Sequence, residues 1–223
     1  MKMIDPKCAK CKQKYCYEGI TDESLLPAFC PVKNFKVLIQ EVKEKYSTEE
    51  IHHFFLSSAL TEKEAYDEKA AREEGRTVPI RPRIKEIAEF GKKIHAKKIG
   101  IAFCIGLADE AGRASTILEK HGFEICSAIC CCGTLDKTDL GIPSEYKIRD
   151  PEKFESACNP LLQAEIFNKA ETDFNIIIGL CIGHDMLFTK YSNAPVTTLI
   201  VKDRFTGHNP IISLYTRYHR DIV

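Results

Sequence analysis

The sequence contains no apolar run that approaches the roughly 18 to 20 residues needed to cross a bilayer, and its first residues, MKMIDPKCAK, lack the apolar core of a secretory signal. It also lacks an excess of charge of either sign. The 32 Lys and Arg residues balance the 32 Asp and Glu residues, so the total charge favours neither nucleic acid nor an anionic membrane as partner. These absences predict a soluble, cytoplasmic protein with no nucleic-acid or membrane partner.

Nucleotide-phosphate motifs are missing as well. The segment CIGLADEAG places Gly106 and Gly112 around an expected helix start, but it matches neither G-x-G-x-x-G nor the P-loop. No lysine is placed to bind a nucleotide phosphate. We therefore expect neither NAD nor ATP, although the helix N-terminus could hold an anionic group.

Cysteine, in contrast, is abundant. The chain has 11 cysteines in 223 residues, which is below the roughly 8 to 10% of small disulfide scaffolds. The odd count argues against a complete disulfide framework. In a reducing compartment, clustered thiols more often bind metal or carry out redox chemistry.

The strongest single motif lies near the N-terminus. Cys8, Cys11, Cys16 and Cys30 are separated by two, four and thirteen residues, in a segment with almost no hydrophobic periodicity. A metal rather than an apolar core is expected to hold such a segment together. Four thiolates suit either tetrahedral zinc or a cubane iron–sulfur cluster. Pro31 follows the last cysteine, as in bacterial ferredoxin runs, which favours iron–sulfur.

The following region is predicted to be helical. Residues 34–75 show helical spacing of apolar side chains and end at Gly75. Two capping-box patterns support this prediction: Ser47 with Glu50, and Thr61 with Glu64. A further helix is expected over residues 84–94, after the VPIRPR break.

From residue 97 onward, apolar blocks and helical patterns alternate. Strands are expected at 98–103, 123–129, 174–180 and 196–202, and helices at 108–121, 160–170 and 184–191. This alternation predicts an α/β fold, a Rossmann-like, mainly parallel sheet of about four strands flanked by helices. The expected organisation has three parts: a metal-bound cysteine module at 1–33, a helical segment at 34–96, and the α/β domain at 97–223.

Several cysteines follow the expected strands. Cys104 comes after the first strand, Cys130 to Cys132 after the second and Cys181 after the third, while Cys158 precedes a helix. Because the carboxyl ends of parallel strands share one edge of a sheet, these thiols are expected to converge in a pocket. The candidate cofactor-binding residues are Cys104, Cys131, Cys132, Cys158 and Cys181.

Other interpretations of these cysteines stay open. Free cysteine is also a common core residue, and Cys126, inside its strand, is assigned to the core. If the second strand continues, Cys130 and Cys132 point to one face and Cys131 to the other. The pattern does not decide which of the three is a ligand.

Two histidines and an aspartate are candidate catalytic residues. His184 lies three residues after Cys181, where it could bind a metal or act as general acid or base, with Asp185 orienting its ring. The alternative is that Asp185 only complements the dipole of its helix. His208 follows the last strand, in a loop that also contains the secondary candidates Asp203, Arg204 and Asn209.

The segments CAKCKQKYC, AFCIGLADEA and CNPLLQAEIFNKAETDFNIIIGLCIGHDMLFTKYSNAPVTTLIVKDRFTGHNP resemble an uncharacterised cysteine-rich family of archaea and anaerobic bacteria that is described as metal-binding. The resemblance covers nearly the whole chain. It implies metal binding without an established reaction, and an anaerobic habitat favours oxygen-sensitive clusters. The motif-bearing residues that it implies are Cys8, Cys11, Cys16, Cys30, Cys104, Cys158, Cys181, His184 and His208.

These patterns support three hypotheses. The first is an iron–sulfur protein with an N-terminal cluster and a second one held by Cys104, a triplet thiol, Cys158 and Cys181, for electron transfer or reductive small-molecule chemistry. The second is a zinc protein with a structural N-terminal zinc and a catalytic or thiol-redox pocket in which the neighbouring Cys131 and Cys132, or Cys104, reacts. The third is a metal-handling protein without turnover. The expected partners are an electron-transfer protein and a small molecule, and the oligomeric state stays open.

Overall fold

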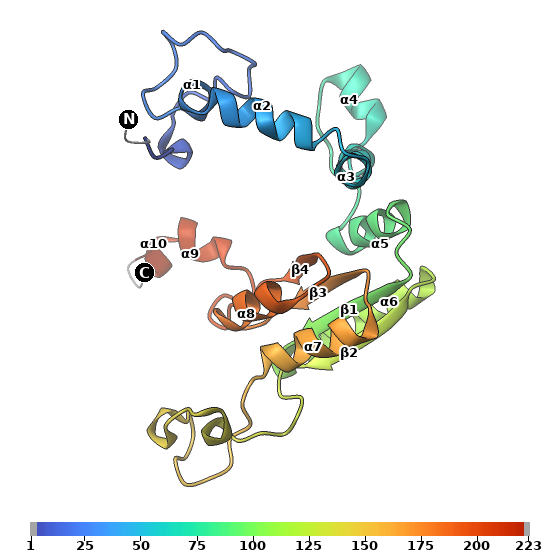
Figure 1. The fold of residues 1–223 in the computed structure, drawn as a ribbon, viewed down its shortest axis with the longest axis vertical. Coiled ribbons are helices and arrows are strands. Elements are labelled where there is room, and N and C mark those ends of the chain that lie inside the picture. Colours follow the sequence, from blue (N-terminus) through green and yellow to red (C-terminus); the bar gives the residue numbers. More distant parts are fainter. Residues whose placement is uncertain (1–3, 221–223) are drawn as a thin grey trace. The chain divides into compact units, whose positions relative to one another are not determined.

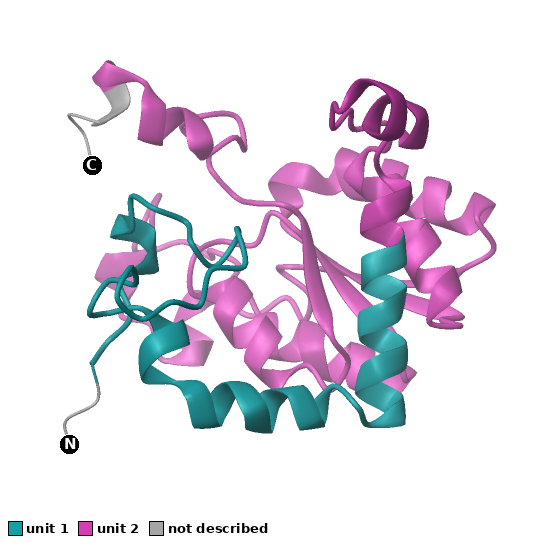
Figure 2. Ribbon diagram, turned by 90° about the horizontal axis from the view of Figure 1, so that it is seen from above, with its two compact units in different colours: residues 1–60 teal, residues 61–223 magenta. Residues whose placement is uncertain are grey.

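The computed structural model describes residues 4–220 and forms two compact units, residues 1–60 and 61–223 (Figure 2). Each unit is described by itself. The three-part division expected from the sequence stays a prediction.

The first unit is mostly irregular up to residue 30. It contains the short 3-10 helix η1 (Cys8–Lys10), and then α1 (Pro31–Asn34), α2 (Lys36–Lys45) and the first part of α3 (Glu49–Glu64). Leu26 is the one buried hydrophobic side chain among residues 4–60. The cysteine module therefore has no apolar core of its own among these residues, in agreement with its sequence pattern.

The helical prediction for 34–75 is confirmed, but one of its boundaries was placed wrongly. Thr61 lies inside α3 and does not begin a helix. The next helix, α4 (Glu68–Glu74), is capped by Asp67, whose carboxylate accepts hydrogen bonds from two backbone N–H groups of the first turn. Gly75 ends this helix with a φ of 63°, as expected. Ser47 precedes α3 by two residues, and its hydroxyl donates to the Lys43 carbonyl.

The α/β prediction is confirmed by a four-stranded sheet in the second unit, with all strands parallel and in the order β2-β1-β3-β4. Its strands are β1 (Lys98–Phe103), β2 (Glu124–Ile129), β3 (Phe174–Ile178) and β4 (Val196–Ile200). Its main helices are α5 (Arg83–Lys93), α6 (Ala108–Lys120), α7 (Pro160–Ala170) and α8 (His184–Tyr191).

Helices cover both faces of the sheet (Figure 1). Ile99 and Ile101 of β1 pack with residues of α5 and α6, such as Leu118, in one buried cluster. Ala102, the next residue of β1, belongs to a second buried cluster on the opposite face of the sheet. This cluster contains Phe167 of α7 and Phe188 of α8. Strand side chains alternate between these two layers, which is the pattern of a doubly wound sheet.

Two strands end earlier than the sequence pattern indicates. β3 ends at Ile178 because Gly179 adopts a φ of 67°, which turns the chain out of the strand. A side chain at Gly179 would also collide with Leu107, 2.0 Å from its Cδ1. β4 ends at Ile200, after an irregularity in its pairing with β3. Lys202 consequently lies in a loop rather than in the strand.

A long insert follows β2. We call residues 133–156 the cap; it contains the 3-10 helices η3 (Lys137–Leu140) and η4 (Ser144–Tyr146) and extends away from the strands as the yellow-olive segment of Figure 1. The short 3-10 helix η2 (Ile105–Leu107) follows β1, and the short helices α9 (Ile211–Tyr215) and α10 (Arg217–Arg220) follow β4. Within residues 4–220 no helix has the length and apolarity required to cross a membrane.

Candidate thiol site at the sheet edge

Cys104 and Cys130 occupy equivalent positions at the ends of neighbouring strands. Phe103 pairs with Ile129 in the register of β1 and β2, so each cysteine is the next residue along its strand. The backbone N–H of Cys130 still donates to the Phe103 carbonyl at 2.8 Å, which extends the ladder by one residue. Both side chains are buried in the layer of α7 and α8. The sheet register therefore brings these two thiols together.

Cys158 is positioned by the start of α7. The next residue, Asn159, caps this helix through its side chain, which accepts from the Leu162 N–H, and Pro160 occupies its first position. The Asn159 N–H donates to the Cys130 carbonyl at 2.7 Å, which ties Cys158 to the end of β2.

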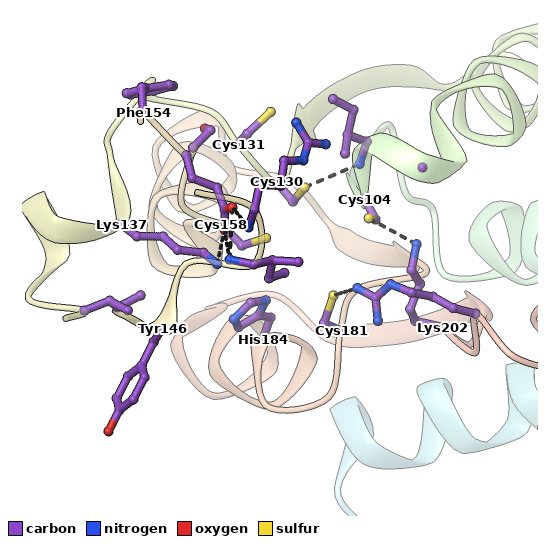
Figure 3. A pocket seen from close by; sticks show the side chains of 18 residues that line it. Cys104, Cys130, Cys131, Lys137, Tyr146, Phe154, Cys158, Cys181, His184 and Lys202 are labelled. Atoms are coloured by element: carbon purple, nitrogen blue, oxygen red, sulfur yellow. Dashed lines mark hydrogen bonds and ion pairs between the residues drawn. The ribbon is translucent and has the colours of Figure 1, made fainter. Parts of the chain in front are cut away.

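Cys181 is positioned by the start of α8. Its carbonyl accepts hydrogen bonds from the backbone N–H groups of His184 and Asp185, so the cysteine is fixed against the first turn of that helix. In Figure 3 the His184 ring lies below Cys158 and beside Cys181. His184 is half-buried and lines the same cavity as both cysteines.

These segments enclose a cavity of about 840 Å³ at the carboxyl edge of the sheet (Figure 3). This volume lies within the about 300 to 1,000 Å³ that is typical of small-molecule sites. The cysteines that line it are Cys104, Cys130, Cys131, Cys158 and Cys181. Five of the eleven thiols of the chain thus meet at one place, as the strand-end argument predicts.

Three hydrogen-bond donors point at the sulfur atoms. Lys202 Nζ donates to Cys104 Sγ at 3.2 Å, and Arg204 Nη2 donates to Cys181 Sγ at 2.8 Å. The backbone N–H of Ile105 donates to Cys130 Sγ at 3.4 Å. Cationic and amide donors stabilise sulfur that carries negative charge, because they interact more strongly with a thiolate than with a neutral thiol.

The pKa values in the cavity follow from these contacts. The Cys130 thiol donates a hydrogen bond to Cys158, and this bond, together with burial, raises the pKa of Cys130. The same bond lowers the pKa of Cys158, although burial of Cys158 acts in the opposite direction. Burial raises the pKa of Cys131, and neighbouring Cys130 adds to that rise. The hydrogen bond to Cys181 raises the pKa of Arg204, so this guanidinium stays charged. Cys158 is therefore the thiol whose thiolate form is favoured.

The structure does not bring every candidate residue into the cavity. Cys132 does not line it, since the chain turns after Ile129 and does not continue as a strand. Asp185 accepts from the Met186 N–H of its own helix turn, and within residues 4–220 its carboxylate makes no hydrogen bond to a cavity residue. His208 Nδ1 accepts from the Asp203 N–H, 3.1 Å away, in a separate turn.

The sequence prediction passed over or ranked low three residues of the site, namely Cys130, Lys202 and Arg204. The alternation of Cys126 and Ala128 along β2, continued by one step, places Cys130 on the same face as Ala102 and Cys104. That signal was present in the sequence. Cys126 itself packs beside this core cluster, half-buried, and burial raises the pKa of its thiol.

The N-terminal cysteines are free thiols in the first unit. Cys8 and Cys16 are exposed, whereas Cys11 and Cys30 are half-buried. The Cys11 thiol donates to the Gln13 carbonyl, and Lys14 Nζ donates to the Cys8 and Cys11 carbonyls. Among residues 4–220, no three His, Cys, Asp or Glu side chains are gathered closely enough to hold a metal ion. The predicted N-terminal metal site stays a prediction.

Comparison with known proteins places the chain in a family. A family model described as "Protein of unknown function (DUF1847)" matches residues 30–199. The chain belongs to this family. It is also 43% identical over 215 residues to Uncharacterized protein MJ0455 of Methanocaldococcus jannaschii, which corresponds to 96% of this chain and 95% of that protein.

The range of the family match separates two groups of candidate residues. Residues 30–199 contain all five cavity cysteines, His184 and Cys30. Cys8, Cys11 and Cys16 lie before this range, and Lys202 and Arg204 lie after it. The sheet-edge thiols thus belong to the part of the chain that the DUF1847 family model matches.

Proposed function

We propose that this DUF1847 protein binds a thiolate-ligated metal centre, preferentially an iron–sulfur cluster, in the sheet-edge cavity, for electron transfer or reduction of a small molecule. The observation that carries the proposal is the convergence of Cys104, Cys130, Cys158 and Cys181 on one cavity. They come from four separate segments, so packing of a single element does not explain their common location.

The donor set fits such a centre. Thiolates are soft ligands that favour iron–sulfur clusters, zinc and Cu(I). Hydrogen bonds to the ligating sulfurs and nearby positive charge tune cluster potentials, and Ile105, Lys202 and Arg204 provide both here. In a cubane cluster each cysteine binds a different iron, so the four sulfurs lie farther apart than around one ion. Within residues 4–220 no three possible ligands are gathered closely enough for a single ion, which favours a cluster over a mononuclear site.

The cavity is larger than its thiols require, and this supports a role with a second molecule. A bound cluster would supply one-electron chemistry, with electrons delivered by a separate redox protein. His184 lines the same cavity and is the residue placed to donate a proton to a reduced small molecule. The four N-terminal thiols are proposed to hold a second centre within the first unit.

Metal analysis tests this proposal. Protein purified without oxygen is expected to contain iron and acid-labile sulfide at about eight each per chain, by analogy with two cubane clusters. Cys181→Ser should remove about half of both, because it removes a cavity ligand, and Cys8→Ser should remove the other half. Cys132→Ser is the matched control, because Cys132 lies outside the cavity and should leave both contents unchanged. Equal iron in wild type and Cys181→Ser would refute the two-site proposal.

A second candidate function is supported by the coupling of Cys130 and Cys158. The hydrogen bond between them favours the Cys158 thiolate, as in thiol-redox sites. In thiol–disulfide exchange, Cys158 would attack a small disulfide and release one thiol. Cys130 would then displace the second thiol and form the Cys130–Cys158 disulfide. Such a protein would carry structural zinc at its N-terminus. Zinc near one per chain, without sulfide, would favour this alternative.

A further inference from the structure

The charge lining the cavity is unbalanced. Positive side chains outnumber negative ones: the cavity is lined by Lys137, Arg149, Lys202 and Arg204, against the single carboxylate of Glu155. A cavity with this charge attracts anions and raises their local concentration.

Three of the four cations already have partners. Lys202 and Arg204 donate to sulfur atoms, as described above. Lys137 forms an ion pair with Glu155, and both side chains are largely shielded from solvent. These three cations are therefore engaged by the protein itself.

Arg149 is different. Its backbone N–H donates to the Glu155 carboxylate at 3.0 Å, which fixes its main chain at the cavity. Its side chain is exposed, and its guanidinium has no hydrogen-bond or ion-pair partner in the described part of the chain. A free guanidinium presents two parallel N–H groups that match the geometry of a carboxylate.

The cap also contributes apolar side chains to the same cavity. Ile148 is 86% exposed, Tyr146 69% and Phe154 61%. Large apolar side chains with this exposure, gathered in a short segment, indicate a surface that binds something. In Figure 3, Tyr146 and Phe154 lie on the side of the cavity opposite Cys181 and Lys202. The cavity thus has an apolar wall on the cap and a thiol wall on the sheet.

From these observations we infer that the cavity binds an organic carboxylate with an apolar, ring-sized body. Arg149 holds the carboxylate, and the apolar side chains of the cap cover the body of the molecule. The inference deepens the proposed function, because it names the class of small molecule that binds beside the thiol wall. It rests on the proposed function only for the reaction that this molecule undergoes. Binding itself depends only on the cap and the cavity.

The test uses three probes and fluorine NMR on the full chain. 4-Fluorobenzoate combines the carboxylate with the apolar body, 4-fluorobenzylamine keeps the body and reverses the charge, and inorganic phosphate is an anion without the body. 4-Fluorobenzoate should bind, the amine should not, and phosphate should not displace the benzoate at equal concentration. Arg149→Met should weaken benzoate binding about tenfold or more, as expected for loss of a charge-assisted pair.

Two further variants make the test specific. Phe154→Ser should also weaken benzoate binding, because it removes part of the apolar wall. Arg113→Met is the matched control: Arg113 is an exposed arginine on α6 that does not line the cavity. Equal binding of the amine, displacement by phosphate, or an unchanged affinity in Arg149→Met would each overturn the inference.

Metal content measured on the same samples separates the two proposals. Arg149-dependent benzoate binding in protein without iron or sulfide would uphold the inference while the cluster proposal fails. A full complement of iron without benzoate binding would overturn the inference and leave the cluster proposal intact.

Discussion

The guanidinium of Arg204 donates a hydrogen bond to the sulfur of Cys181 at 2.8 Å, although the two residues lie in loops that follow different strands. Two residues earlier, Lys202 makes the equivalent contact with Cys104 at 3.2 Å. One loop after β4 therefore delivers two cations to two sulfurs at the ends of β3 and β1. This arrangement gives the loop a direct part in the chemistry of the thiols.

Replacement of Arg204 by Met should weaken retention of the metal centre proposed for the cavity. The variant loses a charge-assisted hydrogen bond to a ligand sulfur, which is worth about 1.5 to 3 kcal/mol, so iron should transfer to a chelator at least about tenfold faster. Arg204→Lys should be intermediate, because it keeps the charge but loses the planar fork. Iron release is followed by absorbance, and release as slow as in wild type would contradict the proposed role.

Replacement of Lys202 by Met should lower the reduction potential of the metal centre proposed for the cavity. A positive charge beside a ligand sulfur stabilises the form with one more electron, so its loss makes reduction harder. The expected shift is on the order of 50 mV, the equivalent of about 1 kcal/mol for one electron. A potentiometric titration of the cavity centre measures it. A higher potential in the variant would exclude this electrostatic role.

The cap should loosen in acid. Glu155 accepts hydrogen bonds from Lys137 and from the Ile148 and Arg149 backbone N–H groups, and these interactions lower its pKa from 4.5 to about 2. Because the folded-state pKa is the lower one, this stabilisation is fully present above about pH 4.5 and is lost as the pH falls toward 2.

Hydrogen exchange of the Ile148 and Arg149 amides measures this change. Protection should fall as the pH decreases from 5 to 3, and Glu155→Gln should show reduced protection already at neutral pH, since its side chain cannot carry the charge. Glu152→Gln is the control, because only the backbone N–H of Glu152, and not its side chain, bonds within the described cap. Protection that is independent of pH would show that other contacts hold the cap.

Gly179 should not tolerate a side chain. Its φ of 67° is unfavourable for other residues, and a Cβ would lie 2.0 Å from Leu107 Cδ1. Gly179→Ala should destabilise the fold by about 2 to 4 kcal/mol. Gly112→Ala, in α6 with no atom within 4 Å of the new Cβ, should instead stabilise it by about 0.5 to 1 kcal/mol. Urea unfolding measures both, and equal midpoints would refute the strain argument.

The sequence pattern was sufficient for the sheet because its elements are marked by local signals. The block KIGIAF is a strand whose four central residues are buried, and the CNP sequence marks the start of α7 through its cap and its proline. The position of Cys104 follows directly from the first block, and that of Cys158 from the second. The two strand boundaries that were wrong depend on contacts that are distant in sequence, namely the fit of Gly179 against Leu107 and the irregular pairing of β4.

The cap could not be predicted in the same way. The folded arrangement of the cap depends on ion pairs between polar residues that are not neighbours in the sequence, such as Lys147 with Asp136 at 3.0 Å. Asp136 also accepts from the backbone N–H groups of Thr138 and Glu155, and these contacts lower its pKa. Polar residues in such a segment have no periodicity. For the same reason Arg149 and Phe154 gave no sign in the sequence that they share a cavity with the thiols.

The ion pairs of the cap have a consequence for how this protein can change. Lys137, Lys147, Asp136 and Glu155 bond to one another and to the cap backbone, so the insert carries its own scaffold between two fixed points, the end of β2 and the start of α7. Its apolar and charged tips can be exchanged without repacking the sheet or moving a sulfur atom. If the proposed function holds, the choice of small molecule and the chemistry performed on it are separable, and a different insert grafted between these points should direct the same thiols to a new ligand.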